Sequence, residues 1–451
     1  MGKFFGTDGV RGLVNREPLT PMTITKLGLA IAAFLRSTAI KEDNSPSVII
    51  GRDTRLSGDM VESALMAGLT AGGVNIALAG VIPTPAISYL TPEGGFDAGI
   101  VISASHNPFG DNGIKLFSHQ GCKLATAAEE AIEAHLLATI MPLAFPTSIG
   151  TSGIFALSER RYIDFLLRAY PLSQKPHSMK VILDCANGST YKVAPAVFAE
   201  LGVDVIAIHN EPNGKNINLN CGSQHTASLS QTVVAQQASC GFAFDGDGDR
   251  VIAVDAHGRT LTGDQLITLC ALWLKRQGRL TNNIVVRTVM SNQGMTNALK
   301  DHGIDYLITD VGDKFVAEGM DKSGAAIGGE DSGHIIFANT LPTGDGILTA
   351  LNVLAVMVAE KRPLAQLADQ MEVLPQVLIS VETAARTDFM GVPTVATAIN
   401  VAQKELGETG RVLVRYSGTQ TLCRVMVEAP DFQQAKTICQ RIAETIVREL
   451  G

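Results

Sequence analysis

Three segments of the chain repeat one pattern of secondary structure, and this repetition constrains the fold more than any other feature. Each segment begins with β-branched residues, continues through a polar loop and a helical stretch, and reaches a glycine before a second β-branched run. The copies cover residues 48–78, 181–208 and 284–308. A glycine after a helix supplies the left-handed residue that ends it, and helices that connect strands in this way cover parallel or mixed sheets. The sequence therefore predicts three related α/β domains.

The end of the chain follows a different pattern. Residues 377–381, 411–414 and 424–427 resemble strands, and residues 431–450 resemble an amphipathic closing helix, which predicts a smaller α+β domain. The chain has 451 residues, more than the roughly 250–300 at which one hydrophobic core stops growing. We therefore expect four domains, at residues 1–150, 151–254, 255–370 and 371–451.

Charge and cysteine usage exclude several classes of partner. The chain has 36 Lys and Arg against 44 Asp and Glu, without a long run of like charge, so nucleic acid and anionic membranes are poor partners. Seven dispersed cysteines without a C-x-x-C pair fit a reduced, cytoplasmic protein better than a disulfide framework or a zinc site. The N-terminal residues lack the apolar core of a signal peptide, and the apolar stretches are shorter than a membrane span. We expect a small anionic substrate, no nucleic acid and no membrane.

Three aspartates at alternate positions form the strongest local signal. Asp245, Asp247 and Asp249 are separated by glycines, which allow the tight curvature that brings carboxylates onto one hard cation. An EF-hand loop begins in the same way, but its sixth position would be Arg250 instead of Gly and its twelfth Ala256 instead of Glu. We therefore expect a Mg²⁺ site between two strands, with an Asp/Gly surface turn as the alternative.

Ser105 is the candidate nucleophile. It lies in the run Ser-Ala-Ser-His-Asn-Pro beside His106, and a serine hydroxyl needs an activating group to act as a nucleophile. The surrounding sequence lacks the G-x-S-x-G of a hydrolase elbow, and the chain lacks a P-loop motif. A structural serine that caps the turn before Pro108 remains the alternative.

Two further loops have side chains that suit a sugar phosphate. Glu330, Ser332 and His334 alternate, so in an extended backbone they would face one side, where they could bind sugar hydroxyls; a solvated loop is the alternative. The C-terminal loop combines guanidinium groups, hydroxyls and a glycine in the manner of a phosphate pocket, with surface arginines as the alternative. Its candidate residues are Arg415, Ser417, Gly418, Thr419 and Arg424.

These four loops occur one per expected domain, after the N-terminal run Phe-Gly-Thr-Asp-Gly-Val-Arg-Gly of residues 5–12. Together they resemble the α-D-phosphohexomutase superfamily over essentially the whole chain, and its bacterial phosphoglucosamine mutases most closely. The closer resemblance rests on that run, on residues 102–108 and on residues 212–223. It implies an α/β fold of four domains around a central cleft: three related α/β/α domains with mixed sheets and a smaller C-terminal α+β domain. These would carry, in order, the phosphoserine, the metal, the sugar loop and the phosphate loop.

The resemblance also implies a role for each candidate residue. Ser105 would be phosphorylated and, together with Asp245, Asp247 and Asp249, would bind Mg²⁺. Glu330 and Ser332 would contact the sugar, and the C-terminal loop would hold the phosphate that is not being transferred. The residues implied near the phosphoryl group, or as acid and base, are Arg11, His106, Lys115, Arg250 and His334.

The implied reaction interconverts glucosamine 6-phosphate and glucosamine 1-phosphate through a phosphoserine and a 1,6-bisphosphate. A hexose bisphosphate would act as activator in a cytoplasmic enzyme, a possible homodimer, that supplies UDP-N-acetylglucosamine and cell-wall synthesis. Asp331 stands where the closest relatives usually have Gln, and Gln420 and Thr421 stand where they usually have Glu-Pro. A phosphoglucomutase or phosphomannomutase, or an inactive regulator that binds sugar phosphate, therefore stays open.

Overall fold

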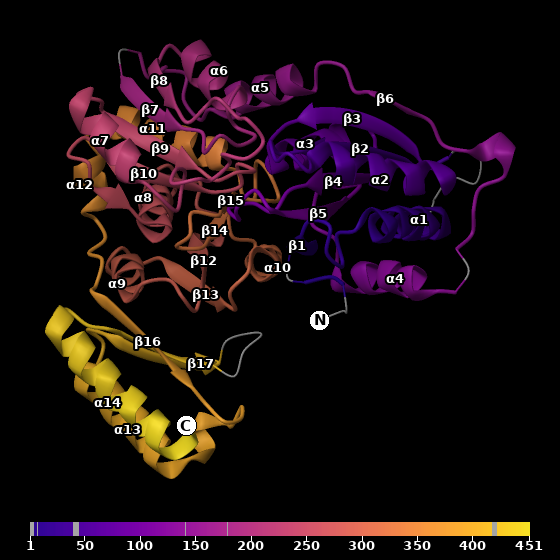
Figure 1. The fold of residues 1–451 in the computed structure, drawn as a ribbon. Coiled ribbons are helices and arrows are strands. Elements are labelled where there is room, and N and C mark those ends of the chain that lie inside the picture. The colour runs from indigo at the N-terminus through magenta and orange to yellow at the C-terminus, as the bar shows by residue number, and fades with distance from the viewer. Residues whose placement is uncertain (1–3, 7, 39–44, 140, 178, 417–421) are drawn as a thin grey trace. The chain divides into compact units, whose positions relative to one another are not determined.

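The computed structural model describes residues 4–6, 8–38, 45–139, 141–177, 179–416 and 422–451 (Figure 1). The chain divides into two compact units. The first comprises Met1–Met290 and Asp305–Asp369, and the second comprises Ser291–Ile304 and Gln370–Gly451.

The first sheet of the larger unit has six strands, and the loop with Ser105 follows the C-terminal end of its strand β4. Its order is β1 (Val10–Leu13), β5 (Asp111–Ser118), β4 (Ala98–Ile102), β2 (Ser47–Arg52), β3 (Asn75–Val81) and β6 (Ser152–Ile154). The pairs on either side of β5 are antiparallel and the others are parallel. The helices of this region are α1 (Pro21–Thr38), α2 (Gly58–Ala71), α3 (Thr84–Glu93) and α4 (Thr126–Leu137).

These helices cover both faces of the sheet because neighbouring strand residues point to opposite sides. Ile100 and Ile102 share a buried core with residues of α1 and α2. A side chain at Gly99, the residue before Ile100, would instead meet Ile87 of α3. Both faces are therefore buried, which explains why β4 is apolar at every position.

A second sheet carries the aspartate loop between two adjacent strands. Its order is β11 (Thr260–Leu261), β10 (Val251–Asp255), β9 (Cys240–Phe244), β7 (Lys180–Asp184) and β8 (Asp204–Ile208). The third sheet has the order β13 (Asp305–Thr309), β12 (Ile284–Thr288), β14 (Ile327–Gly329) and β15 (Ile335–Phe337). The helices that belong with these sheets in the larger unit are α5 (Ser158–Ala169), α6 (Val193–Glu200), α7 (Ala227–Ala235), α8 (Gly263–Arg276), α10 (Asp313–Ser323), α11 (Gly346–Glu360) and α12 (Leu364–Ala368).

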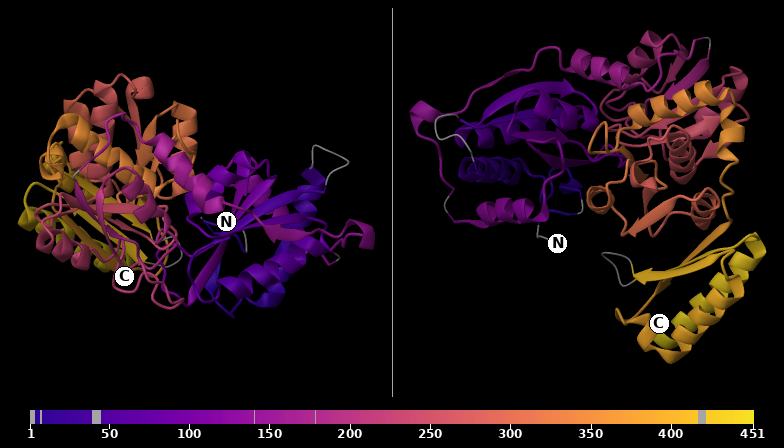
Figure 2. Two further views of the ribbon diagram at one scale, coloured as in Figure 1. Left: turned by 90° about the horizontal axis from the view of Figure 1, so that it is seen from above. Right: turned by 180° about the vertical axis from the view of Figure 1, so that it is seen from behind.

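The smaller unit is an antiparallel sheet with two long helices on one face (Figure 2, right). The sheet order is β16 (Gln376–Glu382), β18 (Leu422–Glu428) and β17 (Arg411–Tyr416). Its helices are α9 (Gln293–Asp301), α13 (Pro393–Leu406) and α14 (Phe432–Leu450), and the apolar stripes of α13 and α14 share one buried core with the sheet. The predicted strands and closing helix are confirmed.

The three predicted β–α–β repeats are also confirmed. They correspond to β2–α2–β3, β7–α6–β8 and β12–α9–β13, and the two strands of each repeat pair in parallel. Gly73, Gly202 and Gly303 follow the three helices with φ of 86°, 84° and 60°, so a glycine takes the left-handed conformation in each copy. The domain boundaries stay predictions.

Candidate active site

The loop that follows β4 holds Ser105 in an unusual backbone conformation. Ser105 has φ of 51°, in the left-handed region, and its side chain is buried. Its Oγ donates a hydrogen bond to Asp245 Oδ2 at 2.6 Å and lies 3.3 Å from His106 Nδ1. The structure therefore brings together a serine and an aspartate that are 140 positions apart.

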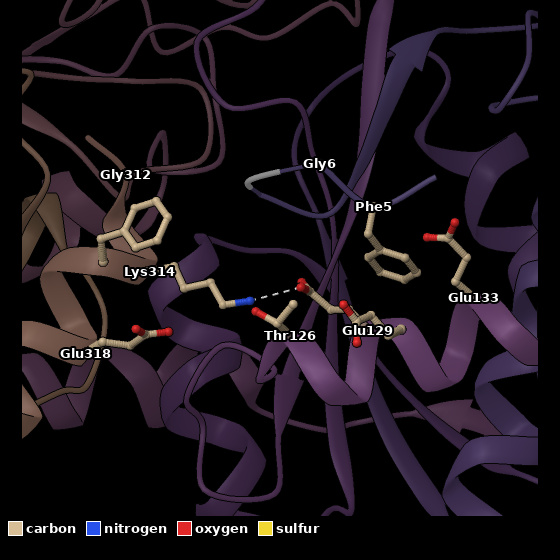
Figure 3. Close-up of a pocket in the computed structure, with 10 residues that line it drawn as sticks. Phe5, Gly6, Thr126, Glu129, Glu133, Gly312, Lys314 and Glu318 are labelled. Atoms are coloured by element: carbon tan, nitrogen blue, oxygen red, sulfur yellow. Dashed lines mark hydrogen bonds and ion pairs between the residues drawn. The ribbon is translucent and has the colours of Figure 1, made fainter. Parts of the chain in front are cut away.

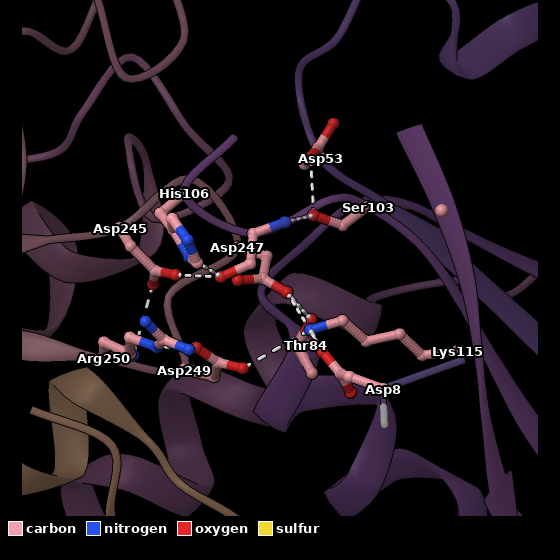
Figure 4. Close-up of polar contacts among 12 residues, drawn as sticks. Asp8, Asp53, Thr84, Ser103, His106, Lys115, Asp245, Asp247, Asp249 and Arg250 are labelled. Carbon is pink, nitrogen blue, oxygen red and sulfur yellow. Dashed lines mark hydrogen bonds and ion pairs between the residues drawn. The ribbon is translucent and has the colours of Figure 1, made fainter. Parts of the chain in front are cut away.

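The aspartate loop is a tight turn between β9 and β10, and Figure 4 shows its three aspartates together with Lys115 and Arg250. Asp245, Asp247 and Asp249 are almost completely buried, and each offers one carboxylate oxygen within 4.8 Å of the others. Oδ1 of Asp247 and Oδ1 of Asp249 accept no hydrogen bond from the described residues. Buried carboxylates with unused oxygens fit a hard cation such as Mg²⁺, so this triad can bind a metal ion.

A second group, Asp184, His209 and Cys221, is also close enough to hold an ion. Asp184 differs from Asp247 and Asp249 because both of its oxygens accept hydrogen bonds, Oδ1 from Ala186 N at 2.9 Å and Oδ2 from Gly222 N at 3.0 Å. Its carboxylate therefore orders two loops of the second sheet, and the aspartate triad is the better metal centre.

Lys115 places a buried cation among the carboxylates. It projects from β5, and its Nζ lies 2.8 Å from Asp247 Oδ2, 3.4 Å from Asp249 Oδ2 and 3.1 Å from Asp8 Oδ2. Burial favours the neutral amine, but Asp247, Asp8 and Asp249 outweigh it and raise the pKa of Lys115 above its ordinary value. Lys115 is therefore protonated in the site and supplies a fixed positive charge among the carboxylates.

The carboxylates of the triad differ in their affinity for protons. Burial, followed by the charges of Asp249 and Asp247, raises the pKa of Asp245 well above its ordinary value. Burial acts in the same direction on Asp249, but Lys115, His334 and Arg250 outweigh it and hold the pKa of Asp249 at about 2. Positive charges therefore compensate Asp249 better than Asp245, and Asp245 is the aspartate that Ser105 contacts.

His106 and His334 lie in contrasting surroundings. Burial, and then Arg250 and Arg11, lower the pKa of His106 to about 4, so its imidazole is neutral near pH 7. His334 is buried, and neither ring nitrogen makes a hydrogen bond with the described residues. A side chain at Gly344 would come within 2.5 Å of the His334 ring, so this glycine leaves room for the imidazole. The neutral imidazole of His106 therefore lies beside Ser105, whereas the His334 ring fills the space that Gly344 leaves.

Two of the predicted arginines lie among these carboxylates. Arg250 follows the triad directly, and its backbone pairs with His334 in an antiparallel bridge. Burial opposes its charge, but Asp249 and Asp245 raise the pKa of Arg250 above its ordinary value. Arg11 contacts Asp8, which also contacts Lys123. The predicted Arg11, Lys115 and Arg250 therefore lie with the triad in one charged network.

The expected extended backbone of the sugar loop was wrong. Residues 330–334 do not run extended, because β14 and β15 form a hairpin in which Gly333 takes φ of 89°. Glu330 is nearly buried, and its Oε1 accepts from Gly312 N at 3.0 Å, whereas Ser332 is exposed at the turn. A hairpin of this length needs a left-handed residue, so the glycine reverses the chain and the alternation of side chains is lost.

Several residues of the site were not predicted from the sequence. Asp8 binds Lys115, Lys123 links Asp8 to Asp313, and Thr84 Oγ1 donates to Asp247 Oδ2 at 2.6 Å. Asp8 does stand inside the recognised N-terminal run, which is the one signal that could have identified it. The other contacts join residues far apart in the chain, which local patterns do not reveal.

Two hollows adjoin this region, and their charges distinguish them. The cavity drawn in Figure 3 has a volume of about 220 Å³ and is lined by Phe5 and several glutamates. The one lysine in its lining, Lys314, pairs with Glu129 at 3.0 Å. Its carboxylates would repel a phosphate. A groove of about 530 Å³ has a mixed lining and has room for a hexose beside the charged network. Its basic residues are Lys123, Lys314 and His334, and its acidic residues are Asp313, Glu318 and Asp321.

The smaller unit presents two arginines side by side. Arg415 of β17 and Arg424 of β18 stand directly opposite each other, and neither pairs with a carboxylate among the described residues. Burial, and then Arg424, lower the pKa of Arg415. Like charges opposite each other repel, so this pair favours a bound anion. Ser417, Gly418, Thr419, Gln420 and Thr421 lie outside the described residues.

No helix in the described part of the chain is long and apolar enough to cross a membrane.

The chain matches the four phosphoglucomutase/phosphomannomutase domain descriptions in order. The three α/β/α domains match residues 2–141, 160–258 and 262–374, and the C-terminal domain matches residues 354–445. A phosphoglucosamine mutase of Syntrophus aciditrophicus is 50% identical over 453 residues, with 100% of each chain covered.

Solved structures share the fold at lower identity. A phosphoglucomutase/phosphomannomutase family protein from Burkholderia thailandensis has a TM-score of 0.80 and 21% identity, with 98% of this chain and 96% of that chain covered. N-acetylphosphoglucosamine mutase of Aspergillus fumigatus, in complex with GlcNAc-6P and magnesium, has a TM-score of 0.71 and 18% identity, with 98% and 95% covered. With four domains matched and a full-length relative at this identity, the chain belongs to the phosphoglucomutase/phosphomannomutase family, in its phosphoglucosamine mutase branch of phosphotransferase isomerases.

Proposed function

We propose that the chain interconverts glucosamine 6-phosphate and glucosamine 1-phosphate, with Ser105 as the residue that carries the phosphoryl group. The observation that carries this proposal is the contact between Ser105 Oγ and Asp245 Oδ2, at 2.6 Å, within a buried carboxylate triad. A serine that only capped a turn would need neither three buried aspartates nor a buried lysine beside it. The expected product is a precursor of UDP-N-acetylglucosamine and of the cell wall.

We propose Mg²⁺ as the ion of the triad, held by Asp245, Asp247, Asp249 and an oxygen of phosphorylated Ser105. When bound, it would neutralise charge on the phosphoryl oxygens. The unused oxygens of Asp247 and Asp249 support this assignment, as does the magnesium in the A. fumigatus neighbour.

In the proposed first half-reaction, the free 1-hydroxyl of glucosamine 6-phosphate attacks the phosphorus of phospho-Ser105. A new O–P bond forms as the bond to Ser105 Oγ breaks, and the product is the 1,6-bisphosphate. The hydroxyl loses its proton to a base, for which His334 is the candidate, and Lys115 is the candidate donor to Ser105 Oγ. Arg11 and Arg250 carry positive charge toward the phosphoryl group, where transfer needs it most.

In the second half-reaction the bisphosphate turns over and returns its 6-phosphoryl group to Ser105. The acid and base then exchange roles. The phosphate not being transferred must be held in both orientations, and we assign this task to Arg415 and Arg424 together with Ser417, Gly418 and Thr419. Their support is the close guanidinium pair, which lacks a carboxylate partner among the described residues.

The sugar itself is assigned to Glu330 and Ser332, which belong to the same turn as His334, a lining residue of the groove. The amine at carbon 2 of glucosamine is positively charged in part near pH 7, and the carboxylates of Glu330 and Asp331 suit it better than a neutral hydroxyl. A phosphoglucomutase or phosphomannomutase is the second candidate, because the same carboxylates can also accept a hydrogen bond from a hydroxyl at carbon 2. We also infer that the enzyme is cytoplasmic and can form a homodimer.

A panel of sugar phosphates tests this proposal. With Mg²⁺ and a catalytic amount of a hexose bisphosphate, a coupled assay compares glucosamine, glucose and mannose 6-phosphates. We expect the highest kcat/KM for glucosamine 6-phosphate; a higher value for glucose or mannose 6-phosphate would reassign the substrate.

Ser105→Ala tests the chemistry separately. It should abolish turnover and the phosphoryl group detected by intact-mass measurement, whereas Ser37→Ala, a change of an exposed serine in α1, should leave both unchanged. A protein that is phosphorylated but shows no turnover would indicate a regulator instead of an enzyme. Activity of Ser105→Ala near that of the wild type would refute the phosphoserine.

A further inference from the structure

We propose that Asn218, together with Arg55, is a positioning residue that holds the Ser105 loop in register with the aspartate triad. This inference rests on the proposed phosphoserine function and names residues that set its geometry. Neither side chain contacts the Ser105 hydroxyl. Both act on the backbone that carries it.

The carbonyl oxygens of Ser105 and Asn107 are where the two side chains meet. Arg55 Nη2 donates to Ser105 O at 2.9 Å and to Asn107 O at 2.8 Å, and Nη1 donates to Asp111 O at 3.0 Å. Asn218 Nδ2 donates to the same two oxygens, at 2.9 and 3.1 Å. Each carbonyl thus accepts two hydrogen bonds, one from each side chain.

The buried carboxylate of Asp53 holds the guanidinium group of Arg55 in place. Asp53 Oδ2 accepts from Arg55 Nε at 2.8 Å and from Ser103 Oγ at 2.6 Å, and Ser103 Oγ in turn accepts from Ser105 N at 2.9 Å. The Ser105 peptide group is therefore held at its N–H and at its carbonyl oxygen. A φ of 51° costs a non-glycine residue free energy, and such a conformation persists only when the surroundings determine it.

Asn218 connects the Ser105 loop to the second sheet, which carries the triad. Its own N–H donates to Ala186 O at 2.9 Å, and the loop before it is bound to the Arg55 loop because Leu56 N donates to Gly214 O at 2.8 Å. Gly246, between Asp245 and Asp247, packs against both partners: a side chain there would meet Ser105 O at 2.6 Å and Asn218 Nδ2 at 2.7 Å. The Ser105 loop, the triad and Asn218 form a single junction.

This junction sets the distance between Ser105 Oγ and Asp245. Substrate binding uses other residues, so loss of the junction should slow phosphoryl transfer and leave the sugar's affinity nearly unchanged. Loss of two hydrogen bonds and a small displacement of the nucleophile predict a fall in kcat of about tenfold or more.

The test compares Asn218→Ala with Asn220→Ala. Both asparagines lie in one loop with similar left-handed φ values, 58° and 54°, but Asn220 is exposed and donates to neither carbonyl. The backbone cost of the substitution is therefore matched. We expect Asn218→Ala to lower kcat about tenfold or more, with KM within about twofold of the wild type and slower rephosphorylation of Ser105 by the bisphosphate. Asn220→Ala should behave as the wild type.

Two further variants keep the inference falsifiable. Asn218→Gly accepts the left-handed backbone without strain, and replaces Asn218→Ala if that variant does not fold. Asn218→Asp keeps the volume but turns a carboxylate oxygen toward two carbonyl oxygens, so its kcat should fall further. Equal kcat and rephosphorylation rates in Asn218→Ala and Asn220→Ala would overturn the inference, as would a change confined to KM. Failure of the proposed function is distinguishable, because the wild type itself would then lack turnover or a phosphoryl group on Ser105.

Discussion

Gly246→Ala tests the geometry of the site with one added methyl group. The φ of Gly246 lies outside the left-handed region, so its backbone accepts alanine. The new Cβ would lie 2.6 Å from Ser105 O, 2.7 Å from Asn218 Nδ2 and 2.8 Å from Ile217 Cδ1, and ordinary contact begins at 3.4 Å. The neighbours must therefore move by about 0.8 Å, because carbon and oxygen atoms repel steeply below contact distance.

That displacement predicts two measurable effects. Overpacking of this kind costs roughly 1–3 kcal/mol in the free energy of unfolding. A misplacement near 1 Å of a reacting group costs about a hundredfold in rate, so kcat should fall between about ten- and a hundredfold. The assay is mutase turnover at saturating sugar phosphate and Mg²⁺, with thermal unfolding of the same preparation.

Gly153→Ala is the matched control, because Gly153 also lies outside the left-handed region and a methyl group there meets nothing within 4 Å. It should change neither kcat nor the unfolding temperature. If Gly246→Ala keeps the kcat of the wild type and its Ser105 phosphorylation, the placement of Ser105 against the triad does not limit the reaction, and the reasoning is wrong.

Further predictions concern the cations, the metal and the pH dependence of stability. Lys115→Met leaves three buried carboxylates without their lysine, and should cost about 3–5 kcal/mol in the free energy of unfolding and abolish turnover; a fully stable variant would contradict the buried ion network. EDTA should abolish turnover and Mg²⁺ restore it, with Asp245→Asn needing at least about tenfold more Mg²⁺, as a titration of rate against Mg²⁺ would show. Arg415→Ala should lower kcat/KM about ten- to a hundredfold without loss of unfolding free energy, since it also relieves repulsion with Arg424. Burial raises the pKa of Asp345 to about 6, although hydrogen bonds from the backbone and Tyr162 act in the opposite direction. The contribution of Asp345 to stability is therefore full below pH 4 and is lost as the pH rises to about 6. Asp345→Asn, which can still accept from Leu348 N, should remove about 1–3 kcal/mol of that loss when urea unfolding is compared at pH 4 and pH 8.

The repeats and the aspartate loop were predictable because each is a local pattern. Alternating glycines require a turn, and three acids on that turn need a cation, so Asp245, Asp247 and Asp249 can be recognised without knowledge of their neighbours. The same local reasoning failed for Ser332. Gly333 permits both an extended strand and a reversal, and the pairing of β14 with β15 decides between them.

The supporting contacts were not predictable, because they depend on how the sheets meet. Arg55 was visible only as part of a polar loop after a strand, and Asn218 only as part of a family motif. Each becomes significant through carbonyl oxygens that lie 50 to 113 positions away in the chain. Hydrogen bonds to backbone carbonyls leave little trace in a single sequence, since any residue supplies the acceptor.

Phosphorylation of Ser105 would place additional negative charge beside the buried carboxylates of the triad. A phosphoryl group on Ser105 adds nearly two negative charges next to Asp245, in a buried region where repulsion is strong. With the free hydroxyl, Ser105 donates to Asp245 while Lys115 binds Asp247 and Asp249. Phosphorylation removes that donated hydrogen bond and leaves Asp245 facing another anion. In the proposed phosphoserine state, the oxygens of Asp247 and Asp249 that lack hydrogen bonds would therefore be available to a divalent cation, and the cation would offset the added negative charge.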